Sequence, residues 1–143
     1  MEVQQVLNPD VAFLVTNILK GVIERGTAQR VWASGLHRPL AGKTGTTDDN
    51  RDSWFVGFSP SRLTVVWVGR DDNASTGLTG ASGALGIWIR FMAEALKTAP
   101  QESFEVPPDI RWFDIVREKG CRGGEGEILR EAFLQDTEPP LCK

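Results

Sequence analysis

One short segment of the sequence carries the side chains needed to hold an anionic group. It reads Ala41-Gly42-Lys43-Thr44-Gly45-Thr46-Thr47. Lys43 provides a positive charge, and Thr44 and Thr46 provide hydroxyl donors, a combination that suits a carboxylate or a phosphate. Gly45 leaves room for a ligand to lie close to the backbone. The segment therefore predicts an anion-binding site, and its surroundings must decide between the two anions.

A phosphate-binding loop of nucleotide-binding proteins is the first alternative. Such a loop has a glycine five positions before its Gly-Lys-Thr sequence and lies between a strand and a helix. Here the corresponding residue is His37, and the next element after Thr47 is a predicted strand. Nucleotide binding is therefore not expected.

The elements that must position this segment form a mixed pattern of helices and strands. Asn8-Pro9-Asp10 is typical of a helix start, with a capping side chain before a proline. Three β-prone runs at 40–47, 53–58 and 63–69 predict consecutive antiparallel strands. In the first helix, which ends near Gly26, apolar residues recur with helical spacing and predict a core-facing stripe of Val11, Leu14, Val15, Ile18, Leu19, Val22 and Ile23.

A second helix and a tail complete the pattern. After Pro100 the chain is rich in proline and glycine, with one strand-like run from Ile110 to Val116 and little else that is regular. We therefore expect an α+β fold in which an antiparallel three-strand sheet packs with helices, followed by a small irregular appendage at 100–143. The second helix is expected to be largely covered through a stripe of Leu85, Trp88, Ile89, Met92 and Leu96, widened by Ile87 and Phe91.

The composition of the chain argues against several classes of binding partner. A chain of 143 residues suffices for one compact core, and a net charge of −3 with scattered basic residues gives no surface for nucleic acid or an anionic membrane. No apolar run is long enough to span a bilayer, and the N-terminus lacks the features of a signal peptide. Asp48-Asp49-Asn50 and Asp71-Asp72-Asn73 lack the spacing of a calcium loop and are interpreted as turns. No metal or cofactor is expected.

The two cysteines leave two alternatives open. Cys121 and Cys142 lie in the tail and could close a loop of about 20 residues, with a stabilisation of roughly 3 kcal/mol. Such a bond suits an oxidising compartment. Two free thiols in a reducing compartment are the alternative. A zinc site is not expected, because the sole histidine, His37, lies far away in the sequence.

The wider sequence favours the carboxylate over the phosphate. Lys43-Thr44-Gly45 matches the Lys-Thr-Gly element of penicillin-recognising serine enzymes, here on a predicted strand. Further motifs are the helix from Pro9, Gly26-Thr27-Ala28, Gly42 to Thr47 with Asp48 to Phe58 after it, Val66-Trp67-Val68-Gly69-Arg70-Asp71 and Gly80-Ala81-Ser82-Gly83-Ala84. With these motifs the chain resembles the C-terminal part of the transpeptidase domain of the class A, bifunctional, penicillin-binding proteins.

The resemblance implies a partial penicillin-binding-protein or serine β-lactamase-like fold, with residues 1–99 in the transpeptidase domain. That family cross-links peptidoglycan by acyl transfer from a stem peptide ending in D-Ala-D-Ala, through a serine acyl-enzyme that β-lactams trap. Stem peptides and β-lactams are therefore the implied ligands of the complete domain. The implied location is periplasmic or otherwise extracytoplasmic, with a membrane anchor outside this chain. An appendage with a cysteine pair also resembles the family and favours a disulfide between Cys121 and Cys142.

The resemblance also implies roles along the motif strand. Lys43 and Thr46 are implied as catalytic: Lys43 in the proton network of the serine enzyme, and Thr46 through a backbone N–H in the oxyanion hole, where one donor is worth about 3 kcal/mol. Lys43, Thr44, Gly45, Thr46 and Thr47 are implied to bind substrate, which could pair with the strand through backbone hydrogen bonds. Since alternation points Lys43 away from Thr44, its side chain must curl around a strand edge.

The nucleophile of such an enzyme is absent from the sequence. The chain contains no Ser-x-x-Lys and no Ser-x-Asn, and in the family both motifs lie upstream with the strands that complete the sheet. We therefore predict an inactive fragment that needs the N-terminal part of the same protein and exposes the edge of its 63–69 strand. The alternative is a standalone non-catalytic module that binds peptide carboxylates or another protein.

Several other side chains receive structural interpretations. Trp54, Trp67 and Trp88 are interpreted as core residues rather than as platforms for sugars. Asp52 is interpreted as a structural hydrogen-bond acceptor that follows the motif strand, and His37 as a surface loop residue.

Overall fold

The computed structural model describes residues 4–143, which form two compact units. The sheet unit comprises Ile18–Phe104, and the disulfide unit comprises residues 4–17 with Glu105–Lys143. Each unit contains an antiparallel sheet, and helices accompany the sheet of the first. The predicted α+β class is confirmed.

Helix α1 (Pro9–Glu24) contributes residues to both units and begins where the sequence predicts. The backbone N–H of Asp10 donates to Asn8 Oδ1 at 2.8 Å, so the asparagine caps the helix. None of the helices formed by the described residues is long and apolar enough to cross a membrane. The division of the chain into residues 1–99 and 100–143 stays a prediction.

The apolar stripe predicted on α1 is buried only in part. Ile23 is buried as expected, but the helix also buries Phe13, whose ring packs edge-on against Trp112 at 6.0 Å. Helical spacing identifies residues that share a stripe, but it does not show which stripe meets a partner. The prediction was therefore wrong for three members of the stripe, which are exposed: Val11 (41%), Val15 (48%) and Ile18 (67%).

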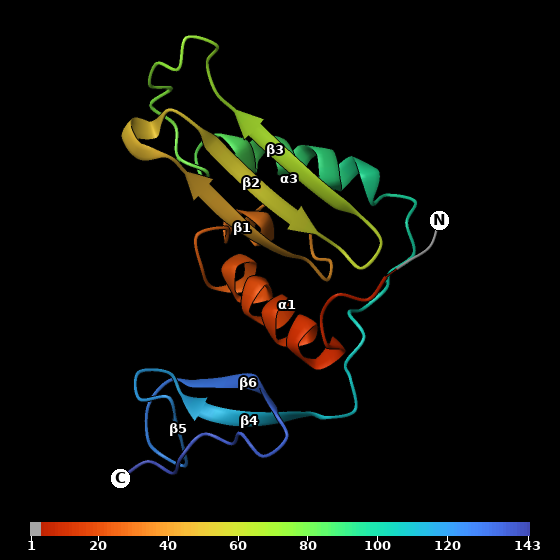
Figure 1. Ribbon diagram of the computed structural model, residues 1–143, viewed down its shortest axis with the longest axis vertical. Helices are drawn as coiled ribbons and strands as arrows, with labels where there is room; N and C mark the ends of the chain where they lie inside the picture. The colour runs from red at the N-terminus through yellow and green to blue at the C-terminus, as the bar shows by residue number, and fades with distance from the viewer. Residues whose placement is uncertain (1–3) are drawn as a thin grey trace. The chain divides into compact units, whose positions relative to one another are not determined.

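Three strands form the sheet of the sheet unit, each within its predicted run. They are β1 (Ala41–Thr46), β2 (Ser53–Phe58) and β3 (Leu63–Val68), with a 3₁₀ turn η1 (Asp48–Asn50) between the first two. Consecutive strands pair antiparallel in the order β1-β2-β3, as predicted (Figure 1). Within the described residues, β1 and β3 are therefore the edges of this sheet.

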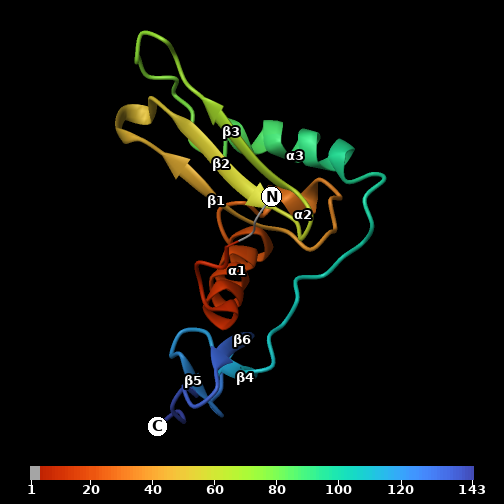
Figure 2. The ribbon, with the colours of Figure 1, turned by 45° about the vertical axis from the view of Figure 1, so that its right-hand side comes forward.

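Helix α3 (Ala84–Ala95) covers one face of this sheet, as both ribbon views show (Figures 1 and 2). Trp88 is fully buried there, with its ring 4.9 Å from that of Phe55 and its Nε1–H donating to Gly57 O at 3.3 Å. The short helix α2 (Arg30–Ala33) adds the buried Val31. The rest of this core consists of Ile23, Ala28, Leu40, Ala84, Leu85, Ile89, Met92 and Leu96.

The opposite face of the sheet is open. Trp54 and Trp67 pair across β2 and β3 with ring centroids 6.1 Å apart, yet they are 39% and 49% exposed. Trp88 is a core residue as predicted, but the same interpretation was wrong for these two, because alternation places them on the face that α3 does not cover. Also exposed are Val56, Leu63 and Val65 on the strands, and Ile87 and Phe91 of α3, which the predicted wide stripe had placed inside.

The disulfide unit has more regular structure than predicted. Strand β4 (Ile110–Val116) is joined by β5 (Cys121–Arg122) and β6 (Ile128–Leu134) in the order β5-β4-β6. Strand β6 was missed because its sequence, ILREAFL, mixes helix-forming residues with weak alternation. Cys121 and Cys142 form a disulfide, with Cα atoms 5.0 Å apart, which decides between the two alternatives left by the sequence.

Candidate active site

The free edge of β1 is the place where a ligand could reach the predicted motif. The backbone N–H of Thr47 donates to Asp52 O at 3.2 Å, which marks residues 47 and 52 as a hydrogen-bonded antiparallel pair. Such pairs alternate along a ladder, so Gly45 and Lys43 also bond to β2. The N–H and C=O groups of Thr44 and Thr46 consequently point away from β2, toward the edge that no described strand occupies.

Lys43 reaches this free edge although its side chain starts on the open face of the sheet. The residue pairs with Val56, whose side chain lies on that face. Its ammonium nevertheless lies 2.8 Å from Thr44 O and 3.2 Å from Thr44 Oγ1. The side chain therefore curls around the strand edge, as the role implied by the family resemblance needs. No carboxylate within the described residues pairs with this ammonium, which leaves its charge available to an anionic ligand.

Thr44 joins the motif strand to the turn that follows α1. Its Oγ1 lies 3.0 Å from Thr27 Oγ1, so the two hydroxyls share a hydrogen bond. A Cβ on Gly26 would lie 2.8 Å from Val22 Cα, so only glycine lets the chain turn this tightly before Thr27. We did not predict Thr27 as a site residue. The signal in the sequence was its place in Gly26-Thr27-Ala28, a motif far from Lys43 along the chain.

Thr46 joins the motif strand to the loop before α3. Its Oγ1 accepts a hydrogen bond from the Gly80 backbone N–H at 2.9 Å, so the hydroxyl proton stays free to be donated. A Cβ on Gly80 would lie 2.7 Å from Gly45 O and 2.6 Å from Trp54 O, so the loop can pack on the sheet only with glycine here. Gly45 itself faces Trp54, whose Cβ would lie 3.1 Å from an added Cβ.

Comparisons with known proteins identify the family. A scan against protein-family models finds no match. Over 148 residues the chain is 41% identical to penicillin-binding protein 1A of Aquifex aeolicus, covering 98% of this chain and 19% of that protein. It is 38% identical over 142 residues to penicillin-binding protein 1A of Pseudomonas aeruginosa, covering 96% of this chain and 17% of that protein. The chain belongs to the class A penicillin-binding protein family.

The structural comparison agrees with this assignment. The crystal structure of penicillin-binding protein 1A from Haemophilus influenzae matches with a TM-score of 0.83 and 32% identity, over 94% of this chain and 21% of that chain. The predicted family and the predicted fold are both confirmed. The chain spans about a fifth of the length of the penicillin-binding proteins it matches, in their C-terminal part.

In this penicillin-binding protein chain, the predicted substrate contact Thr47 is engaged within the turn between β1 and β2. Its hydroxyl donates to Asp52 Oδ2 at 3.0 Å and accepts from the Asp52 N–H at 2.8 Å. Asp52 Oδ1 accepts from Trp67 Nε1 at 2.8 Å, so this carboxylate ties all three strands together as a structural acceptor. Thr47 stays a predicted contact, but its hydroxyl and its amide are both already bonded.

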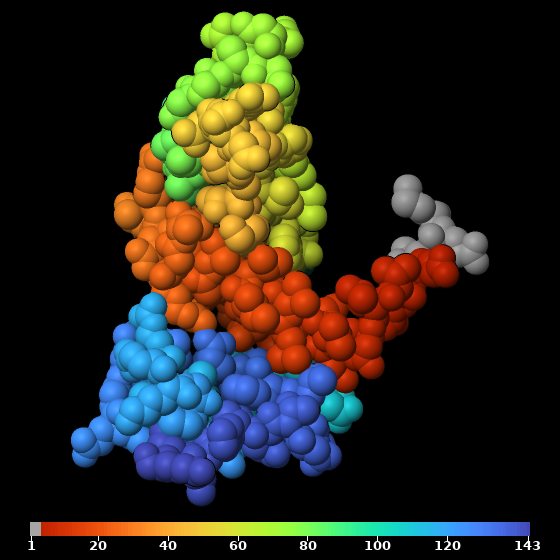
Figure 3. All heavy atoms as spheres, turned by 60° about the vertical axis from the view of Figure 1, so that its left-hand side comes forward, coloured from red at the N-terminus to blue at the C-terminus, as the bar shows by residue number. Residues whose placement is uncertain are grey.

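The loop from Asp71 to Ser82 lies beside that turn, and both lie at the surface of the molecule in the space-filling view (Figure 3). Ser75 Oγ donates to Asp49 O at 2.5 Å, and Thr76 donates to Asn50 O through both its N–H and its hydroxyl. At the base of the loop, the Arg70 guanidinium holds the pKa of Asp72 below its usual range, and the Ala74 N–H adds to the effect. The middle of the loop is thus bonded to the turn that follows the motif strand β1.

Proposed function

We propose that this chain supplies one wall of the active site of a serine D,D-transpeptidase that cross-links peptidoglycan. In this proposal β1 holds the terminal carboxylate of a D-Ala-D-Ala stem peptide, or the carboxylate of a β-lactam. The observation that carries the proposal is the position of the Lys43 ammonium, 3.2 Å from the Thr44 hydroxyl at a free strand edge. An ammonium and a hydroxyl placed together donate charge-assisted hydrogen bonds to one carboxylate.

Thr46 supports a second part of the site. Its hydroxyl can donate to the same carboxylate while it accepts from Gly80. Its backbone N–H points to the free edge, where it can stabilise the negative charge that develops on a carbonyl oxygen under attack. One donor of this kind lowers a transition-state barrier by about 3 kcal/mol. A substrate lying along this edge would also bond to the outward-facing groups of Thr44 as an added strand.

The reaction needs groups that this sequence does not contain. A serine hydroxyl from another part of the protein would attack the carbonyl carbon of the penultimate D-Ala. The amide bond to the terminal D-Ala would break, that residue would leave as an amine, and the acyl group would pass from the serine oxygen to an amine of a neighbouring stem peptide. Without Ser-x-x-Lys and Ser-x-Asn, we expect the chain by itself to be inactive and to need the N-terminal part of the same protein.

The proposed location is extracytoplasmic, with a membrane anchor elsewhere in the protein. The Cys121–Cys142 disulfide supports it, because such bonds persist in oxidising compartments. A standalone, non-catalytic module that binds peptide carboxylates is the second candidate function. It is favoured by one observation: the hydrogen bonds that join Lys43, Thr44 and Thr46 to Thr27 and Gly80 all form within this chain.

Fluorescent-penicillin labelling tests the proposal. We expect covalent label on a longer chain that carries Ser-x-x-Lys and Ser-x-Asn, and none on the 143-residue chain. In the longer chain Lys43→Ala should slow labelling by about tenfold to a hundredfold, because a charged donor to the carboxylate is lost. Lys97→Ala is the matched control, since Lys97 is an exposed lysine that pairs with Glu94 on α3. No label on the longer chain would favour the non-catalytic module.

A further inference from the structure

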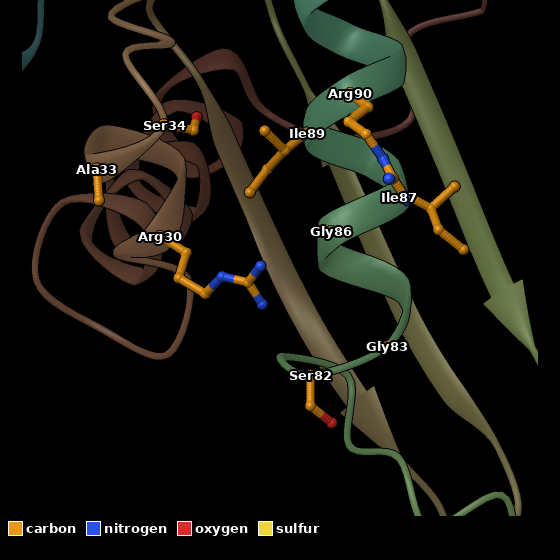
Figure 4. Close-up of a pocket in the computed structure, with 9 residues that line it drawn as sticks. All are labelled: Arg30, Ala33, Ser34, Ser82, Gly83, Gly86, Ile87, Ile89 and Arg90. Carbon is orange, nitrogen blue, oxygen red and sulfur yellow. The ribbon is translucent and has the colours of Figure 1, made fainter.

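A cleft of about 500 Å³ lies between α2 and α3, on the sheet unit (Figure 4). Arg30, Ala33 and Ser34 line it from the α2 side, and Gly86, Ile87 and Arg90 line it from α3. Its volume falls within the range of about 300–1,000 Å³ that is usual for small-ligand sites. Neither Lys43 nor any other residue of β1 lines it.

The cleft is open because its walls carry small residues where the two helices approach. A Cβ added to Gly86 would have one neighbour within 4 Å, Arg30 Nη2 at 3.8 Å. The Arg30 guanidinium therefore approaches α3 at Gly86. Figure 4 shows its side chain extending from α2 toward α3, while that of Arg90 runs along α3 toward Ile87. Gly86 and Arg90 are four residues apart, so they share one face of the helix.

Neither arginine has a carboxylate partner within the described part of the chain. Arg30 Nη1 donates to Ala81 O at 3.2 Å, and Arg90 makes no hydrogen bond or ion pair with a described residue. No Asp or Glu lines the cleft, although the chain as a whole is acidic, with a net charge of −3. Two uncompensated guanidinium groups make this a local positive site on an acidic chain. Ser34 and Ser82 also line the cleft, and their hydroxyls are bonded to Val31 and Thr79 respectively.

We propose that this cleft binds an oxyanion, a carboxylate or a phosphate group, through Arg30 and Arg90. A guanidinium presents N–H donors in a planar fork that matches both anions, and both arginines line the same cleft. Two hydrogen bonds link the cleft to the motif strand β1. Arg30 donates to Ala81 O, and the N–H of the preceding residue, Gly80, donates to Thr46 Oγ1. The proposal does not depend on the function proposed for Lys43.

Titrations of the 15N-labelled 143-residue chain test the proposal. The chain carries Lys43→Ala, because this substitution removes the positive charge of the other candidate anion site. The two probes are inorganic phosphate and N-acetyl-D-alanyl-D-alanine, followed by amide NMR shifts. We expect saturable shifts at Gly83 and Gly86 with at least one probe, and which probe binds more tightly identifies phosphate or peptide carboxylate as the anion. Arg30→Gln or Arg90→Gln should weaken binding by about tenfold. Arg62→Gln is the control, since Arg62 is exposed at the β2–β3 turn.

A second variant separates binding from folding. Gly86→Leu keeps both arginines and adds a helix-forming residue whose side chain enters the cleft. This substitution should abolish the shifts that the probes cause, while the other amide signals keep the dispersion of a folded chain. Absence of saturable shifts with both probes, or shifts that Arg30→Gln, Arg90→Gln and Gly86→Leu all leave unchanged, would overturn the proposal. Binding seen only when Lys43 is present would likewise assign the anion to β1 and overturn it.

Discussion

The two units of this chain are stabilised by different means. The sheet unit has a continuous apolar core in which Trp88, Phe55 and Met92 are fully buried. In the disulfide unit the buried apolar residues are few: Phe13, Ile110, Val116 and Cys121. A covalent bond between Cys121 and Cys142 stabilises that unit beside its small core, as disulfides do in small domains with few buried apolar residues.

This difference bears on function, because the candidate site lies on the unit with the larger core. Lys43, Thr44 and Thr46 lie on β1, whose neighbour β2 packs against α3. Two loops are bonded to that strand, through Thr27 and through Gly80. Donors that must be in place before a substrate arrives are best held on such a rigid element. The residues named for the candidate site all belong to the sheet unit.

The largest effect is expected from removing the centre of the sheet unit. Trp88→Ala would delete a fully buried ring that contacts Phe55, and should lower the free energy of unfolding by about 3–5 kcal/mol. Trp67→Ala on the open face should cost about 1 kcal/mol, mostly through its bond to Asp52. Urea denaturation followed by circular dichroism measures both. Equal losses would mean that the open face is covered in solution.

Breaking the disulfide should have the next largest effect, and it should be confined to one unit. The bond joins residues separated by 21 positions, so Cys121→Ser with Cys142→Ser should cost about 3 kcal/mol. In hydrogen-exchange measurements, the amides of β4 and β6 should then lose protection, whereas the amide of Phe55 should keep it. A reducing agent should reproduce the effect in the unmodified chain and do nothing to the double variant. Loss of protection at Phe55 would contradict the division into independently stabilised units.

The sequence predicted the sheet unit better than the disulfide unit for physical reasons. Strands β1 to β3 lie in short β-prone runs bounded by Asp/Asn-rich and Ser-Pro-Ser turns, so their ends could be predicted directly. In β6, Arg130, Glu131 and Ala132 favour a helix, and only pairing with β4 makes the segment a strand. Strand alternation shows which residues share a face of the sheet, but it does not show which face α3 covers. Trp54 and Trp67 were therefore wrongly predicted to be core residues.

The candidate site shows the same limit. Lys43 to Thr47 form a local motif, but strand geometry alone points Lys43 away from Thr44, and the curl of its side chain is seen only in the structure. Thr27 and Gly80 were not predicted as site residues, because they meet β1 only through tertiary packing. The cleft lined by Arg30 and Arg90 was also beyond prediction. Those arginines lie 60 positions apart, and no sequence pattern indicates that α2 and α3 face each other.

A pair of glycine substitutions sharpens the comparison within the sheet unit. A Cβ on Gly80 would lie 2.6–2.9 Å from backbone atoms of Trp54 and Gly45, so Gly80→Ala should cost about 1–3 kcal/mol and displace the loop from Thr46. Gly86→Ala meets only Arg30 Nη2 at 3.8 Å and should stabilise α3 by about 0.5–1 kcal/mol. Thermal unfolding should therefore show a lower midpoint temperature for Gly80→Ala and a higher one for Gly86→Ala. A stabilised Gly80→Ala chain would show that the loop does not pack on β1 and β2.

The smallest effect is expected at the exposed pair that holds the base of the Asp71–Ser82 loop. Arg70 donates to both carboxylate oxygens of Asp72, at 2.9 and 2.8 Å, and lowers the pKa of that carboxyl. Because the pKa is lowered in the folded chain, the pair stabilises the loop fully above the ordinary aspartate range and loses this effect as the pH falls through the lowered pKa. Arg70→Gln should raise the titration midpoint of Asp72, followed by the carboxyl carbon shift in NMR, and leave Trp88 packing untouched. A midpoint that does not move would assign the lowered pKa of Asp72 to the hydrogen bond from the Ala74 N–H instead.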